Sequence, residues 1–432
     1  MQSDSRSSEE KMRDFSPWRH EISLGPTSFV IMENTFKNTF RIYDSNADLD
    51  IYSKRAALKS SETMASLVSF VGEEILFCAS GTTIECNSTD DGIFEAFLLT
   101  TTSLLRRSNF EDIVADNIYK GLYLFFLFQI IVHFWDGKSY EGDVIGCDFY
   151  YNIATVRIRS EVPLQTAILR DVDDSMPISP EVARDLRETT KPTLGRHSNK
   201  FILVPGDKVV AVGRYHTEGY DLMVAPGIFS ADCCRLDCKE LFRANCKITK
   251  VVSSFLPSGI GGPLLNLDGE VIGINFIGRL CTPFLPMNIV SRWWTHFKRH
   301  GQFCRPWIRV ETANLFSGRV DVLEHIVRKF PNFSKGVIVE KVEQGSPADI
   351  AGINPNDVIV QCDGKKVKNF LGKVGQAVEL EVIRPHDGAH LTVSVFVSEC
   401  TLVNRWPLLR GSPNLEEKTS RIDISVIIKA LV

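Results

Sequence analysis

The segment Pro257-Ser-Gly-Ile-Gly-Gly-Pro-Leu-Leu265 is the part of this chain that decides its fold and its chemistry. Its glycines and prolines predict a tight loop that leads into a hairpin, because the apolar runs 263–267 and 270–276 flank the turn Asp268-Gly269. Ile260 lies at the centre of the loop. Its branched hydrocarbon side chain has no lone pair to attack a carbonyl and no proton for a base to remove.

Two earlier segments fit the same scheme: Leu98-Leu-Thr-Thr-Thr-Ser-Leu-Leu105 and Gly146-Cys-Asp-Phe-Tyr-Tyr-Asn-Ile-Ala-Thr-Val156. Together the three segments resemble, in order, the catalytic segments of the HtrA/Deg (Do-like) serine proteases, a chymotrypsin-like family. The resemblance places Ile260 at the nucleophile position, Ser103 at the position of the basic histidine and Asn152 at that of the orienting aspartate. It implies a trypsin-like double β-barrel in which no residue of the catalytic triad is intact.

The size of the catalytic loss favours a pseudoenzyme. In a serine protease, losing one key triad member lowers turnover by on the order of 10⁶-fold, and an oxyanion hole alone retains only roughly 10³–10⁴-fold over water. Ser258, two residues before Ile260, would need a shifted loop and a new base to act in its place. We therefore predict that the barrels keep the protease shape without its chemistry.

Short apolar runs around these segments predict mainly β structure. Expected strands of the two barrels lie at 66–71, 75–79, 82–86, 130–134, 139–145, 201–204, 207–213, 263–267 and 270–276. After Pro286, apolar residues recur at helical spacing as far as Gly301, which predicts a helix closing the second barrel.

A second module follows, over residues 302–399. The run Lys335-Gly-Val-Ile-Val-Glu-Lys-Val-Glu-Gln-Gly-Ser-Pro-Ala-Asp-Ile-Ala-Gly-Ile-Asn-Pro-Asn-Asp357 resembles the PDZ domain that follows the protease in HtrA/Deg proteins. We expect a short helix at 348–351 with Gly352 as its cap, and closing strands at 378–383 and 391–396. The predicted fold class is a mainly β double barrel followed by a small α+β PDZ domain.

The resemblance also implies where this module binds peptides. PDZ domains add a chain terminus as an extra strand and hold its carboxylate. The corresponding motif is Trp307-Ile308-Arg309-Val310, with Arg309 where the family has glycine. A guanidinium can hold a carboxylate, but the turn needs a conformation that glycine adopts most easily. Carboxylate binding and a purely packing role both stay open.

The predicted organisation has four parts. Residues 1–60 form an N-terminal extension that is partly disordered, 61–301 the degenerate protease domain, 302–399 the PDZ domain and 400–432 a C-terminal tail. The apolar stretch 121–129 fits no expected strand of the barrel. It is either a buried or partner-binding insertion or a sequence artefact.

Composition limits the compartment, the cofactors and the partners. A formal charge of −4 predicts no binding of nucleic acid or an anionic membrane. The polar, acid-containing N-terminus and the eleven cysteines predict reduced thiols and an intracellular location, cytoplasmic or nuclear. A cluster of four cysteines with His216 upstream lacks a zinc-finger spacing, so we expect no metal and no cofactor: Cys233, Cys234, Cys238 and Cys246.

Two functions remain after this reasoning. The first is a noncatalytic protein that binds or scaffolds polypeptide chains or protein C-termini through the PDZ groove and the vestigial cleft, alone or in homo- or hetero-oligomers such as trimers with related proteases. The alternative is an active Do-like endopeptidase in protein quality control. It would have to use unorthodox residues, and the nearest substitutes are Asp143, Asp148 and His133.

Overall fold

The structure is a computed structural model of the 432-residue chain. It describes residues 32–33, 49–105, 128–173, 200–216, 219–230, 238, 240–246, 248, 250–251, 259–276, 281–301, 303–315, 319–330, 336–366 and 373–400. The first fifteen residues, most of the stretch 121–129, Cys233, Cys234 and Ser258 therefore lie outside the described residues.

The first barrel is a seven-stranded sheet in the order β6-β5-β2-β3-β4-β8-β7. Its strands are β2 Met64–Val71, β3 Glu74–Ser88, β4 Phe94–Thr100, β5 Phe128–Phe134, β6 Ser139–Glu141, β7 Asp143–Asp148 and β8 Ile153–Ser160. Neighbouring strands are antiparallel, and alternate residues such as Ala96, Leu98, Ile130 and Val132 are fully buried in one apolar cluster.

The second barrel is closed, in the order β11-β12-β13-β17-β16-β15. Its strands are β11 Lys208–Arg214, β12 Leu222–Ser230, β13 Phe242–Ala244, β15 Pro263–Leu265, β16 Val271–Asn275 and β17 Thr282–Pro286. Two further pairs lie outside it: β9 Asp171–Asp173 with β10 Lys200–Ile202, and β1 Met32–Glu33 with β14 Lys250–Val251. The aromatic rings of Phe229, Phe242 and Phe284 pack against one another in its core.

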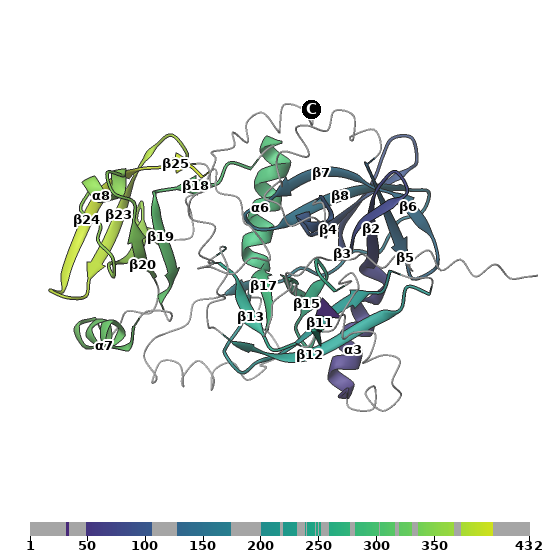
Figure 1. Ribbon diagram of the computed structural model, residues 1–432, viewed down its shortest axis with the longest axis horizontal. Helices are drawn as coiled ribbons and strands as arrows, with labels where there is room; N and C mark the ends of the chain where they lie inside the picture. Colours follow the sequence, from purple (N-terminus) through teal and green to yellow (C-terminus); the bar gives the residue numbers. More distant parts are fainter. Residues whose placement is uncertain are drawn as a thin grey trace, which may run out of the picture.

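Helix α6, Met287–His300, joins the two barrels, and it ends where the sequence predicts, at Gly301 with φ 69°. Trp293 and Trp294 are buried on its inner face. Phe297 reaches the first barrel, because a methyl group added to Gly146 of β7 would lie 2.8 Å from the Phe297 ring. Figure 1 shows α6 between the barrels and the smaller module.

Helix α3, Ile51–Ser60, was not predicted. Asp50 caps its N-terminus by accepting hydrogen bonds from the backbone N–H groups of Tyr52 and Ser53. Its buried face consists of small residues only: Ser53, Ala56, Ala57 and Ser60. A helix that buries serines and alanines leaves no period of large apolar residues in the sequence, so pattern analysis misses it.

The smaller module has the predicted PDZ-like α+β arrangement. Its sheet runs β19-β20-β21-β23-β24, with β22 paired to β21. The elements are β18 Pro306–Trp307, β19 Val310–Asn314, α7 Val320–Lys329, β20 Val337–Val342, α8 Pro347–Ile350, β21 Val358–Cys362, β22 Lys365–Lys366, β23 Ala377–Arg384, β24 Ala389–Phe396 and β25 Ser398–Glu399. The expected short helix is α8, and Gly352 follows it at φ 83°. Helix α7 was not predicted.

Four predicted strands differ from the strands in the structure. The runs 75–79 and 82–86 form one strand, β3, because Gly81 lies within it where the Leu67 side chain and the Leu99 carbonyl approach closely. The run 139–145 divides at Gly142 into β6, which pairs with β5, and β7, which pairs with β8. The run 201–204 contributes to β10, which pairs in parallel with β9 outside the closed barrel.

Among the described helices, none combines the length and the apolar character needed to cross a membrane.

Candidate functional site

The loop before β15 places Ile260 in the protein interior. Only 2% of the side chain is exposed, and it belongs to a buried cluster that also contains Leu99 and Ile153. The backbone around it is tightly held: the Ile260 carbonyl accepts from the Ser80 N–H at 2.8 Å. The Gly261 N–H donates to the Asn275 carbonyl at 2.9 Å. Ile260 therefore acts as a core residue in a rigid loop.

Ser103 and Asn152, which the resemblance assigns to two triad positions, are in contact. Ser103 lies in a short 3-10 helix, η2 Thr102–Leu105, and Asn152 directly precedes β8. The Asn152 side-chain amide donates to Ser103 Oγ at 3.5 Å, and its oxygen accepts from Thr102 Oγ1 at 2.5 Å. Thr101 Oγ1 donates to Ser103 Oγ at 3.0 Å. These are neutral hydroxyl and amide groups, and none of them is a base at neutral pH.

The loop and the polar pair belong to one locality. A methyl group on Gly261 would lie 2.9 Å from Thr100 Oγ1 and 3.0 Å from the Thr101 nitrogen. Asn152 and Ser103 are buried, like Ile260, with 1% and 5% exposure. The structure thus brings the three sequence-predicted positions to the same part of the barrels, inside the core rather than on an accessible surface.

The unorthodox substitutes lie elsewhere and are otherwise engaged. Asp143 is paired with Arg157 at 3.0 Å. Asp148 accepts from the backbone N–H groups of Tyr150 and Tyr151, both at 2.9 Å, and burial raises its pKa.

His133, the third substitute, lies on β5 and stacks on the Tyr220 ring, with the ring centroids 4.7 Å apart. Its Nδ1 is 2.7 Å from Ser139 Oγ and 3.0 Å from the Tyr220 hydroxyl. Burial lowers its pKa, which favours the neutral ring.

The structure shows no group of three metal-ligating side chains within the residues that it describes. Cys238 and Cys246 are buried free thiols, and burial raises the pKa of Cys246 to about 12. A thiol with so high a pKa is a poor metal ligand and a poor nucleophile at neutral pH.

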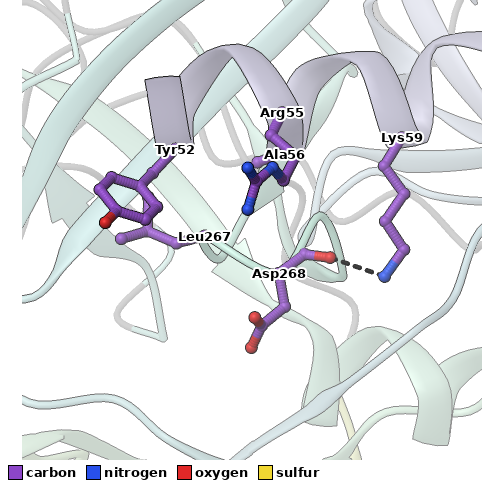
Figure 2. Close-up of a pocket in the computed structure, with 6 residues that line it drawn as sticks. All are labelled: Tyr52, Arg55, Ala56, Lys59, Leu267 and Asp268. Atoms are coloured by element: carbon purple, nitrogen blue, oxygen red, sulfur yellow. Dashed lines mark hydrogen bonds between the residues drawn. The ribbon is translucent and has the colours of Figure 1, made fainter. Parts of the chain in front are cut away.

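A surface pocket lies between α3 and the turn that joins β15 to β16, with a volume of about 340 Å³. Figure 2 shows Arg55 and Lys59 of the helix facing Leu267 and Asp268 of the turn. Lys59 Nζ donates to the Asp268 carbonyl at 2.8 Å. This hydrogen bond joins α3 to the turn of the second barrel. We propose no chemical role for the pocket.

The motif of the smaller module lies at a sheet edge. Trp307 ends β18, which pairs with β25, and Ile308 is buried. Arg309 adopts φ 60°, the left-handed conformation in which the family has glycine, and Val310 begins β19. Among the described strands, β19 pairs only with β20, so its other edge is open to an added strand.

Comparisons with known proteins agree with this architecture. Residues 86–274 match the trypsin-like peptidase domain and residues 319–397 the PDZ domain. The chain is 33% identical over 261 residues to "Putative protease Do-like 14" of Arabidopsis thaliana, an alignment that covers 59% of this chain and 54% of that protein. It is 27% identical over 243 residues to "Serine protease HTRA3" of Homo sapiens, covering 55% of this chain and 47% of that protein.

Among solved structures, "HtrA-type protease AlgW with tripeptide" is similar, with a TM-score of 0.49 and 18% identity, covering 81% of this chain and 97% of that one. The chain spans about half the length of the curated relatives named above. The two domain matches, in this order, and the Do-like relatives lead to one conclusion: the chain belongs to the HtrA/Deg (Do-like) serine protease family, with a trypsin-like domain followed by a PDZ domain.

Proposed function

We propose that this chain is a pseudoprotease that binds or scaffolds polypeptides through its PDZ module. The observation that carries the proposal is Ile260, a hydrocarbon side chain at the position where the family has its nucleophile. Ser103 and Asn152 add no imidazole and no carboxylate. Without a nucleophile and a base, an expected loss of about 10⁶-fold in turnover leaves no useful hydrolysis.

Burial of the three positions supports the PDZ edge over the vestigial cleft as the place where polypeptides are held. A catalytic hydroxyl must reach a substrate carbonyl at about 3 Å, whereas Ile260 packs inside an apolar cluster. The open edge of β19 offers backbone N–H and C=O groups to an extended chain instead. The partners under this proposal are polypeptide chains or protein C-termini.

One observation favours the enzymatic alternative. His133 and Ser139 lie within hydrogen-bonding distance, which is the first requirement of a nucleophile and its base. The pair lies on the β5–β6 hairpin, however, and the same ring nitrogen is shared with the Tyr220 hydroxyl. An active endopeptidase using this pair would be labelled at Ser139.

The test exposes the purified full chain to a fluorophosphonate probe and to casein. We expect no labelled serine and no casein digestion, and we expect the Ile260→Ser variant to be equally inactive because Ser103 is not a base. An active homologue serves as the positive control. Labelling of Ser139, or digestion that a Ser139→Ala variant loses, would establish the enzyme instead.

The binding half of the proposal has its own test. A display library of random peptides with free C-termini, selected on the full chain, should yield ligands. Replacing Thr312 by proline on the edge strand β19 should weaken them. A Thr392→Pro change on β24, the opposite edge of the sheet, serves as the matched control and should leave binding unchanged.

A further inference from the structure

Two histidines lie side by side at the C-terminal end of α6. His296 and His300 are four positions apart, so they lie on the same face of the helix, about one turn from each other. Their ring centroids are 4.4 Å apart, and the ring planes are tilted by 40°. The pair therefore brings together two imidazole rings, and each ring has a nitrogen that can bind a metal ion.

The surroundings hold one ring of the pair and leave the other accessible. His300 is exposed, whereas His296 is half-buried. The Phe303 ring meets the His296 ring edge to face, with the centroids 5.4 Å apart. Among the described residues, no carboxylate pairs with His300 and no hydrogen bond occupies its ring nitrogens. An ion in solution can thus reach His300, next to a second imidazole that is already oriented.

The spacing of the rings suits chelation of one ion. Two nitrogens that bind the same tetrahedral zinc ion at about 2.0–2.1 Å lie roughly 3.3 Å apart. Ring centroids 4.4 Å apart allow rotation of the side chains to bring one nitrogen of each ring to that separation. The same i, i+4 spacing supplies two histidine ligands in helical zinc motifs. The helix dipole also favours a cation at this end of α6, because its C-terminus carries partial negative charge.

We propose that His296 and His300 form a chelating site for a divalent transition-metal ion of the Zn²⁺ and Ni²⁺ class. Imidazole nitrogen is a ligand that both ions accept. Water would complete the coordination, since the part of the chain that the structure describes contains no group of three metal-ligating side chains. The cysteine spacing that lacks a zinc-finger pattern involves other residues, and the site does not depend on the proposed peptide binding.

A bound ion would hold the last turn of α6. Helix ends open more easily than helix centres, and an ion that bridges positions four apart closes one turn. This turn is also packed against aromatic residues: the Phe303 ring that contacts His296 lies 6.4 Å from the Trp293 ring and 6.2 Å from the Tyr151 ring of the first barrel. Metal binding at His296 and His300 is therefore expected to stabilise the junction between α6 and the segment that follows it.

Isothermal titration calorimetry of the purified full chain with Ni²⁺ at pH 7.5 tests the site. Ni²⁺ is the probe because thiolates select Zn²⁺ more strongly, and imidazole is ordinarily neutral at this pH. We expect His300→Ala to weaken this binding event by at least about ten-fold, because one imidazole cannot chelate. Saturating Ni²⁺ should slow hydrogen exchange at residues 297–301 of the wild-type chain, and it should have no such effect in His300→Ala.

Two control variants separate chelation from general affinity for histidine. His386→Ala removes an exposed histidine of the PDZ module and should leave the binding event unchanged. The Thr295→His/His300→Ala double variant keeps the number of histidines but makes the pair adjacent in sequence, where helical side chains do not face each other. We expect the double variant to bind Ni²⁺ as weakly as His300→Ala does.

Binding of Ni²⁺ that is equal in wild type and His300→Ala would overturn the site, and so would equal binding by wild type and the double variant. His300 and Thr295 are both exposed, so these replacements leave the core intact. Equal unfolding temperatures of the metal-free proteins would confirm that a loss of binding reflects the missing ligand. The peptide-selection experiment on the PDZ module is independent of these results.

Discussion

At the scale of single residues, the loop around Ile260 depends on a glycine that cannot be replaced cheaply. Gly261 has φ 78°, and an added methyl group would lie 2.7 Å from the Ser80 carbonyl. The position thus combines a left-handed backbone with close packing of the two barrels. The same closeness keeps Ile260 buried, so the loop functions here as structural core.

We expect Gly261→Ala to lower the free energy of unfolding by about 2–4 kcal/mol, from backbone strain and overpacking together. Gly92 is a matched control because it has the same φ of 78° with nothing within 4 Å of an added methyl group. Gly92→Ala should cost only about 1 kcal/mol. Urea unfolding followed by tryptophan fluorescence measures both, and equal losses would contradict the packing argument.

At the scale of elements, the turn between β15 and β16 is organised by one carboxylate. Glu270 accepts from Arg170 Nε at 3.1 Å, pairs again with Arg170 Nη2, and accepts from Asn266 Nδ2 at 2.8 Å. The hydrogen bond from Arg170 is the main reason that the pKa of Glu270 is lowered. Arg170 and Glu270, which lie 100 positions apart in the sequence, are thereby joined at the hairpin that Asp268-Gly269 predicts.

This lowered pKa predicts a pH dependence. The stabilisation is present above the unfolded-state pKa of Glu270, near 4.5, and is lost as the pH falls through the lower folded-state pKa. We expect Glu270→Gln to cost about 1–2 kcal/mol at pH 7, after a discount for solvent screening. The difference from wild type should shrink progressively as the pH falls below 4.5 and through the folded-state pKa of Glu270. Thermal unfolding between pH 3 and 8 measures it, and a difference independent of pH would refute the assignment.

At the scale of the whole molecule, two arginines connect parts that the sequence keeps apart. Arg214 of β11 is buried and donates to three carbonyls, those of Met64 at 2.8 Å, Ser61 at 2.6 Å and Tyr220 at 2.8 Å. Burial lowers its pKa to about 10, so it remains charged at neutral pH. It joins the second barrel to the start of the first.

Arg305 makes the corresponding connection to the PDZ module. Its guanidinium carbon lies 3.3 Å from the centroid of the Tyr150 ring, and its Nη2 donates to Cys400 Sγ at 2.6 Å. The Cys400 N–H donates back to the Arg305 carbonyl at 2.8 Å. Burial alone would lower the pKa of Arg305, but its charge interactions with Cys400 and Asp148 outweigh burial and raise it.

We expect Arg305→Met to weaken the attachment of the β18–β25 pair to the barrels. The substitution removes the cation that stacks on Tyr150, and it removes the favourable charge interaction of that cation with Asp148. Hydrogen exchange at Trp307 and at residues 398–400 should accelerate by at least about ten-fold, the equivalent of about 1.4 kcal/mol. Arg305→Lys should restore little, since an ammonium cannot stack as a plane. The exposed Arg319→Met is the control, and unchanged exchange in Arg305→Met would remove this role.

The local features of the fold follow from the amino-acid pattern. Alternating apolar residues set most strands, the turn Asp268-Gly269 set the β15–β16 hairpin, and the hydrocarbon side chain at Ile260 is read directly from the sequence. These follow from side-chain chemistry and from contacts between near neighbours in the chain, which a pattern records directly.

Contacts between residues far apart in the sequence could be read only from the folded chain. The continuity of β3 through Gly81, the burial of Ser103 and Asn152, the pairing of Arg309 with Glu343 and the contact of Arg305 with Tyr150 all join residues distant in sequence. No local pattern marks such partners, because their energies arise only once folding has brought the strands together. Which edge of the smaller sheet has no described neighbour was likewise set by the fold, in which β19 pairs only with β20 among the described strands.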